Sequence, residues 1–211
     1  MERNRGRSPV TLLLSITVGC GVLAVIGLVW WDRPIAAWIE SLPRQRAIWT
    51  EALTLLDLAT LKHISNFLLG VLLLLASCLA WLIPVARRHV RPLFYLGMVQ
   101  FMTTVVADLS KPIFGRLRPF EAFERTNGAD TWFISANSFP SGHAAFYAGL
   151  FFPLMLIFPR WAILLMLPPL LVAASRVAEQ DHYLSDVAVS LTVGAGLALT
   201  FRFLLKRPAA T

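Results

Sequence analysis

The chain has 211 residues, of which 57% are hydrophobic and only 15% are charged. An ordinary soluble domain is about half apolar and about a quarter charged, so this composition excludes that class and favours a membrane protein. The formal net charge is +7, but the basic residues stand at the ends of apolar runs, where topology and anionic headgroups account for them. We therefore expect no nucleic-acid partner, and the length fits a single membrane-embedded domain over residues 1–211.

The first apolar run extends from Val10 to Trp31 and follows a basic N-terminal head. It is longer than the apolar region of an ordinary signal peptide, and it ends in Trp30-Trp31-Asp32-Arg33 rather than at a small-residue cleavage site. We expect this run to be retained as the first membrane span.

The segment after this run is amphipathic. Between residues 47 and 61, Ile48, Leu55, Leu58 and Leu61 recur at helical spacing, which predicts a helix lying on the membrane surface.

Five further apolar runs predict additional spans. They cover about residues 64–85, 92–110, 143–159, 161–175 and 183–203. The whole pattern predicts an all-α, polytopic membrane protein with about six transmembrane helices and an interfacial helix between the first two.

The distribution of Lys and Arg predicts the orientation. With six spans, one side of the membrane receives Arg3, Arg5, Arg7, Arg87, Arg88, Arg91, Arg160, Lys206 and Arg207. The positive-inside rule assigns this side and both termini to the cytoplasm, so segments 32–62, 111–142 and 176–182 face outward. In a bacterial inner membrane the outward side is the periplasm. Segment 111–125 is also basic, which conflicts with the rule unless its cations bind an anion.

One outward group of residues predicts a phosphate site. Ser141 and Gly142 open the predicted fourth span, and a helix N-terminus offers free N–H groups and a positive dipole end. Lys111, Arg118 and Arg176 are predicted at the same membrane face, and guanidinium groups bind phosphate oxygens bidentately. A single cation at a span end is usually a headgroup anchor, and this is the interpretation that we favour for Arg116 alone.

Two histidines accompany these cations. His182 and Asp186 are four residues apart at the start of the predicted sixth span, so they share one helix face. A carboxylate at one ring nitrogen fixes the tautomer and makes the other nitrogen more nucleophilic. His143 supplies a second imidazole for acid–base chemistry. An isolated histidine is usually structural, but two of them beside cations indicate a functional site.

These residues resemble the type 2 phosphatidic acid phosphatase superfamily, which also includes the vanadium haloperoxidases. Its signature is Lys, six residues and Arg-Pro; then Pro-Ser-Gly-His; then Ser-Arg, five residues, His, three residues and Asp. All three parts occur here in this order, from Lys111 to Asp186, and the resemblance covers about residues 95–200.

The resemblance implies a role for each matched residue. His182 would attack phosphorus and form a phosphohistidine, Asp186 would orient it, and His143 would protonate the leaving oxygen and then activate water. The phosphate oxygens would be bound by Lys111, Arg118, Ser141, Gly142 and Arg176. No metal or other cofactor is implied, because Lys and Arg supply the charge that Mg²⁺ supplies in kinases.

The chain departs from the family pattern beside His182. Gln180 stands where many members have Gly, and Leu184 where many have Pro, which leaves the loop shape and the substrate open. Glu179 and Asp181 would either oppose a highly anionic headgroup or pair with Arg116 or Arg125. We favour a third interpretation, that they are solvated loop charges.

The resemblance implies a lipid phosphate or diphosphate phosphatase that acts on a membrane lipid from the outer face. Undecaprenyl diphosphate is the favoured substrate, on family prevalence alone; lipid A phosphate, phosphatidylglycerol phosphate and phosphatidate are alternatives. Two further alternatives are a lipid-to-lipid phosphotransferase that uses the same phosphohistidine and a non-catalytic lipid-phosphate binding or transport protein.

Overall fold

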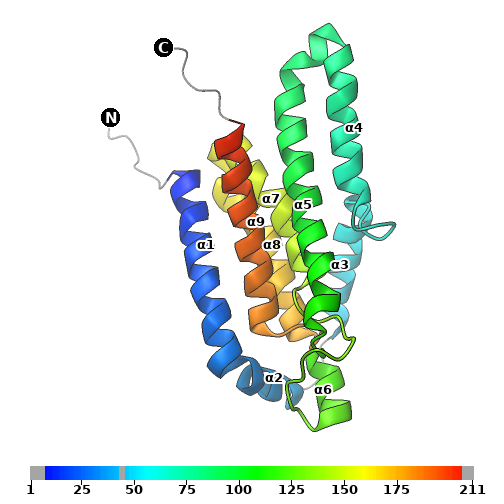
Figure 1. The fold of residues 1–211 in the computed structure, drawn as a ribbon, viewed down its shortest axis with the longest axis vertical. Helices are drawn as coiled ribbons and strands as arrows, with labels where there is room; N and C mark the ends of the chain where they lie inside the picture. The colour runs from blue at the N-terminus through cyan, green and yellow to red at the C-terminus, as the bar shows by residue number, and fades with distance from the viewer. Residues whose placement is uncertain (1–7, 43–45, 206–211) are drawn as a thin grey trace.

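The computed structural model describes residues 8–42 and 46–205, and these ranges form helices joined by turns and loops, without a strand. The α-helices are α1 (Pro9–Ile26), α2 (Asp32–Glu40), α3 (Arg46–Ala59), α4 (Leu68–Leu82), α5 (Val90–Phe114), α6 (Pro119–Thr126), α7 (Gly142–Ile157), α8 (Ala162–Ala178) and α9 (Leu184–Leu204). A π-helical turn, Gly27–Trp31, and two 3₁₀ segments, Pro84–His89 and Pro159–Trp161, complete the set. Figure 1 shows the long helices running side by side as a bundle, which confirms the all-α prediction.

Four helical stretches within the described residues are long and apolar enough to cross a membrane: Pro9–Glu40, Pro84–Thr126, Pro159–Ala178 and Leu184–Leu204. Helices α4 and α7 are also apolar, but they have 15 and 16 residues. At a rise of 1.5 Å per residue each is about 23 Å long, shorter than the hydrocarbon core of about 30 Å. The helices indicate an integral membrane protein, and the count of six spans stays a prediction.

The predicted first span, 10–31, is not one straight helix. Helix α1 ends at Ile26, and the π-helical turn then redirects the chain into α2, as Figure 1 shows at the lower end of α1. Gly27 lies against the start of α9, where an added Cβ would be 3.1 Å from the backbone nitrogen of Ser185. The absence of a side chain at Gly27 therefore lets the turn approach α9 and brings Asp32 next to it.

Helix α7 forms the centre of the bundle and packs against α5, α8 and α9. Its buried residues include Ala144, Ala148, Phe152 and Met155, which belong to the main hydrophobic cluster. An added Cβ at Gly194 would lie 2.5 Å from the Cβ of Ala148, so α9 contacts α7 almost backbone to backbone. This packing fixes the first turn of α7 relative to the first turn of α9.

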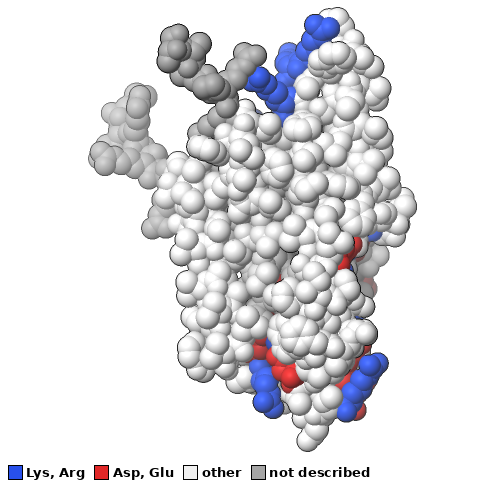
Figure 2. Space-filling model, in the orientation of Figure 1, with Lys and Arg blue, Asp and Glu red and all other residues white. Residues whose placement is uncertain are grey.

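The two ends of the bundle differ in charge. Helix α1 begins, α9 ends and α4 turns into α5 at the upper end of Figure 1, whereas α2 and α6 lie at the lower end. On the face shown in Figure 2, the upper end displays Lys and Arg without Asp or Glu, and the lower end displays both signs. Arg87, Arg88 and Arg91 are exposed at the upper end. The predicted basic residues of the N-terminal head and the C-terminal tail lie outside the described residues.

Helix α3 confirms that a helix follows the first span. Leu53 of α3 packs in a second cluster with Phe146 and Tyr147 of α7, while Leu55 and Leu58 are 68% and 48% exposed. One face therefore contacts the bundle near the start of α7, and another apolar face is left uncovered by the described residues. Its position at the membrane surface stays a prediction.

Candidate active site

The three signature stretches meet at the lower end of the bundle. The first comprises the end of α5 and the loop to α6, the second the start of α7, and the third the end of α8, the turn 179–183 and the start of α9. The backbone N–H of Ser141 donates to the Asp186 carbonyl at 3.3 Å, and the Ser190 hydroxyl donates to the Ser141 carbonyl at 2.9 Å. Lys111 reaches the same point, because its Nζ is 3.1 Å from where a Cβ at Gly142 would be. The fold thus brings the predicted site residues together.

His182 is buried in the turn before α9, with only 4% of its surface exposed. Its Nδ1 lies 2.7 Å from the Ser138 carbonyl oxygen. A carbonyl can only accept, so Nδ1 carries the proton and Nε2 keeps the lone pair. Burial lowers the pKa of His182, and nearby Arg176 and Arg118 lower it further against the opposing effect of Asp186. The imidazole is therefore neutral near pH 7, as a nucleophile must be.

Asp186 is fully buried but does not make the direct hydrogen bond to His182 that four-residue spacing suggests. Its Oδ2 is 3.6 Å from His182 Nδ1. Oδ2 instead accepts from the Ser138 hydroxyl at 2.5 Å and from the Tyr183 amide at 2.9 Å. Ser138 contacts the His182 ring through its carbonyl, and Tyr183 follows His182 in the sequence. Asp186 thus fixes the carbonyl and the turn that hold the imidazole.

Arg116 is the hub of this end of the molecule and has no exposed surface. Its Nη1 donates to Asp186 Oδ1 at 2.5 Å, and its Nη2 donates to Asp32 and Asp130, each at 2.7 Å. The guanidinium carbon lies 3.9 Å from the ring centroid of Tyr183 and also faces Trp132. The interpretation of Arg116 as a headgroup anchor is therefore wrong. It forms ion pairs with three carboxylates, of which Asp32 and Asp186 are buried, and so ties α2 and the loop before α7 to α9.

The predicted phosphate-binding cations have acidic partners. Lys111 Nζ is 2.7 Å from Asp108 Oδ1. Arg176 is 2.7 Å from Glu179 Oε2 and also contacts Asp181, whose other oxygen is 3.7 Å from Arg118.

The interpretation of Glu179 and Asp181 as solvated loop charges is wrong, because both form ion pairs, with Arg176 and, for Asp181, also with Arg118. Glu179 is buried, with 8% of its surface exposed. Both carboxylates form ion pairs with arginines that the resemblance assigns to phosphate binding.

A cavity of about 340 Å³ opens between these groups. It is lined by Leu53, Thr54, Asp57, His143, Arg176, Glu179 and Asp181. His143 therefore faces the same space as Arg176, as acid–base chemistry on a bound phosphate requires. Ser141 caps α7, with its hydroxyl accepting from the Ala144 amide at 3.4 Å, and is itself buried. Its position supports the start of α7 below His143.

Asp57 is a member of this site that the sequence did not indicate. It is on α3 and lies against His143, with Oδ2 3.2 Å from His143 Nε2. The two residues are 86 positions apart in the sequence, so no local pattern could have revealed the contact.

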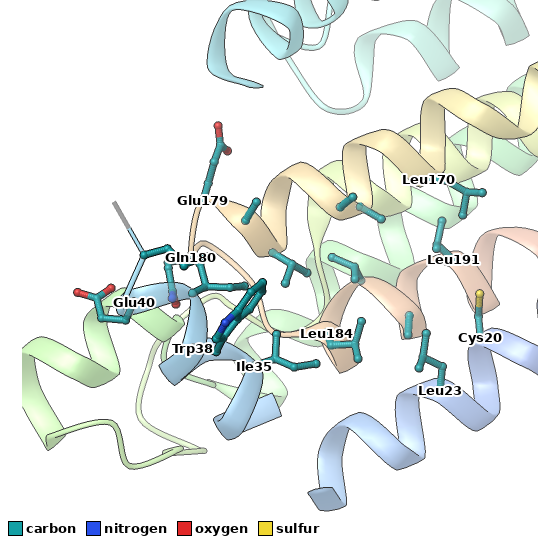
Figure 3. Close-up of a pocket in the computed structure, with 18 residues that line it drawn as sticks. Cys20, Leu23, Ile35, Trp38, Glu40, Leu170, Glu179, Gln180, Leu184 and Leu191 are labelled. Atoms are coloured by element: carbon teal, nitrogen blue, oxygen red, sulfur yellow. The ribbon is translucent and has the colours of Figure 1, made fainter. Parts of the chain in front are cut away.

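A second cavity of about 690 Å³ lies between α1, α2, α8 and α9. Figure 3 shows Leu23, Leu184 and Leu191 around it, with Gln180 at one end; most of its lining is apolar. Glu179 lines both this cavity and the polar one, so the turn 179–183 separates an apolar space from a charged one.

Within residues 8–42 and 46–205, no group of three or more His, Cys, Asp and Glu side chains is arranged to bind a metal ion. The three carboxylates that do converge, those of Asp32, Asp130 and Asp186, surround Arg116. Metal independence stays a prediction.

The model of the PAP2 superfamily matches residues 88–208, more than half of the chain. The chain therefore belongs to the PAP2 superfamily, the type 2 phosphatidic acid phosphatases, which confirms the resemblance.

Two curated relatives are each named lipid A 1-phosphatase. The protein from Rhizobium johnstonii is 32% identical over 127 residues, and the one from Rhizobium etli is 30% identical over 127 residues. These alignments cover 56% of this chain and 52% and 55% of the relatives, so the chain matches about half of their length. No solved structure matches the chain significantly.

Replacing Arg116 tests its role as the hub. In Arg116→Met three carboxylates, two of them buried, lose their cation, so we expect the free energy of unfolding in detergent to fall by about 3–5 kcal/mol. Arg125→Met is the matched control, because Arg125 is exposed on α6. Equal unfolding midpoints for the two variants would contradict this role.

Replacing Asp181 tests whether an acidic side chain competes with bound phosphate. Asp181→Asn removes a partner of Arg118 and Arg176, so inorganic phosphate should bind about two- to fivefold more tightly, the scale of a partly exposed ion pair. The measurement is the inhibition constant of phosphate, with Glu124→Gln as control, since Glu124 is an exposed acid on α6. Weaker binding by Asp181→Asn would rule out competition.

Proposed function

We propose that the chain is a lipid phosphate phosphatase that uses His182 as its nucleophile. The observation that carries this proposal is the hydrogen bond from His182 Nδ1 to the Ser138 carbonyl, 2.7 Å long. It leaves Nε2 unprotonated in a turn that also positions Arg176 and Arg118. Histidine with a free ring nitrogen beside guanidinium groups is suited to attack on phosphorus.

The reaction follows from these positions in two steps. In the first step, His182 Nε2 forms a bond to phosphorus, the bond from phosphorus to the lipid oxygen breaks, and His143 gives that oxygen a proton. In the second step, water attacks the phosphohistidine, His143 takes a proton from the water, and inorganic phosphate leaves. Lys111, Arg118 and Arg176 balance the charge on the phosphoryl oxygens. The phosphate first displaces Glu179 and Asp181 from their ion pairs with the two arginines.

A lipid substrate is supported by the apolar cavity beside the turn 179–183. A space of about 690 Å³ lined mainly by apolar side chains suits a hydrocarbon chain, whereas a soluble phosphate ester would gain nothing from it. The names of the two relatives support lipid A 1-phosphate as a substrate. Undecaprenyl diphosphate stays a prediction, and neither named relative supports it.

The direct test is phosphate release by the protein purified in detergent with EDTA, offered lipid A, undecaprenyl diphosphate, phosphatidylglycerol phosphate and phosphatidate. We expect activity on at least one lipid, no activity for His182→Ala, and a loss of about 10²-fold or more for His143→Ala. His89→Ala is the control, since His89 is exposed at the opposite end of the bundle. Full activity of His182→Ala would refute the mechanism, and a phosphorylated lipid product would indicate phosphotransfer.

We also propose that the site faces the periplasm and that both termini are cytoplasmic. The exposed arginines at the α4–α5 turn support this orientation through the positive-inside rule. In a background with Cys20 and Cys78 replaced by Ala, a cysteine at Ala129 should react with an impermeant reagent added to intact cells. A cysteine at Val85, at the opposite end and 80% exposed, should be protected. The reverse pattern would invert the topology.

A further inference from the structure

Asp57 contacts the second histidine of the site from a helix outside the three signature stretches. Its Oδ2 is 3.2 Å from His143 Nε2, and its Oδ1 accepts from the Tyr147 hydroxyl at 2.5 Å. Tyr147 follows His143 by one turn of α7, so the two side chains share one helix face and contact the two carboxylate oxygens of Asp57. The Thr60 hydroxyl lies 3.2 Å from the Tyr147 hydroxyl and completes the chain of contacts.

This arrangement fixes the direction of the hydrogen bond. Burial raises the pKa of Asp57, but hydrogen bonds from His143 and Tyr147 outweigh burial and leave the pKa below its ordinary value. An ionised carboxylate only accepts hydrogen bonds, so His143 carries a proton on Nε2. The other ring nitrogen is then the one that exchanges a proton with a reactant.

We propose that Asp57 is a positioning residue that holds His143 in one tautomer and stabilises its protonated form for proton transfer to the leaving oxygen. This inference rests on the function proposed above. Asp57 acts through His143 and needs no contact with phosphorus. The proton moves from His143 to the lipid oxygen in the first step and returns from water in the second, and Asp57 stays ionised throughout.

The position of Asp57 supports a role in orienting His143 rather than a purely structural contact between α3 and α7. Asp57 lines the polar cavity together with His143 and Arg176, and its side chain is 18% exposed. A carboxylate that only anchored α3 would have no need to face this cavity. The apolar contacts of Leu53 with Phe146 and Tyr147 already attach α3 to the bundle.

Other charged groups also act on His143 and must stay constant in a test. Lys62 lies in the turn after α3, Arg176 on α8 and Tyr147 on α7, while Glu179 and Asp181 line the cavity from the turn before α9. Burial lowers the pKa of His143 to about 4, and Lys62 and Arg176 also lower it, whereas Asp57 opposes them. Removal of the Asp57 charge alone should therefore lower the pKa of His143.

The kinetic test compares two leaving groups. A general acid matters for an alkyl oxygen, which leaves poorly, and matters little for nitrophenolate, which leaves without a proton. Asp57→Asn should slow hydrolysis of the best lipid phosphate by about 10²-fold and hydrolysis of nitrophenyl phosphate by less than about threefold. Tyr147→Phe should show a smaller loss of the same kind, and Glu51→Gln, an exposed acid on α3, should match the wild type.

Two outcomes would overturn the proposal. Equal losses on both substrates without accumulation of the phosphorylated enzyme would mean that Asp57 only supports the fold, and unchanged rates on both would mean that it has no role.

A titration that does not depend on activity separates this inference from the proposed function. The chain has four histidines, and with labelled histidine the His143→Ala variant identifies the NMR signal of His143. That signal should titrate at lower pH in Asp57→Asn than in the wild type, because a carboxylate partner favours the protonated ring. An unchanged midpoint would overturn the inference. A shifted midpoint in a protein that releases no phosphate would refute only the proposed function.

Discussion

The active end of this molecule depends on one buried cation. Arg116 has no contact with solvent, and three carboxylates share its charge. The guanidinium is the positive charge that allows Asp32, Asp130 and Asp186 to lie together in so small a volume. Because they belong to α2, the loop before α7 and the start of α9, their attraction to Arg116 sets the relative positions of these segments.

The geometry of the proposed catalytic residues follows from this cluster. Asp186 gives one oxygen to Arg116 and uses the other to hold Ser138 and Tyr183, and Ser138 in turn holds the imidazole of His182. The proposed nucleophile, His182, is thus oriented through a chain of contacts that starts at Arg116. The second histidine is held separately, by Asp57 on α3.

The sequence predicted the parts of this site that depend on local spacing. The Pro-Ser-Gly-His start of α7 and the pair His182 and Asp186 were identified by short-range patterns, and the fold brings them to the same end of the bundle. The expected shared helix face is wrong, however, because His182 lies in the turn before α9, and Asp186 acts on it through Ser138 and Tyr183. The partners of Arg116 could not be predicted, because Asp32 and Asp186 are 84 and 70 residues away and many acids were equally plausible. The bend after α1 was missed for a similar reason, since Gly27 meets α9 only in the folded bundle.

The central claim is that phosphate passes through His182, and trapping the intermediate tests it most directly. The enzyme would be mixed with a lipid carrying radiolabelled phosphate and quenched in alkali, in which phosphohistidine survives, and the labelled peptide would be sequenced. We expect the label on the peptide that contains His182, and none in His182→Ala. Rapid release of labelled phosphate with no labelled protein, or a label on another residue, would contradict the claim.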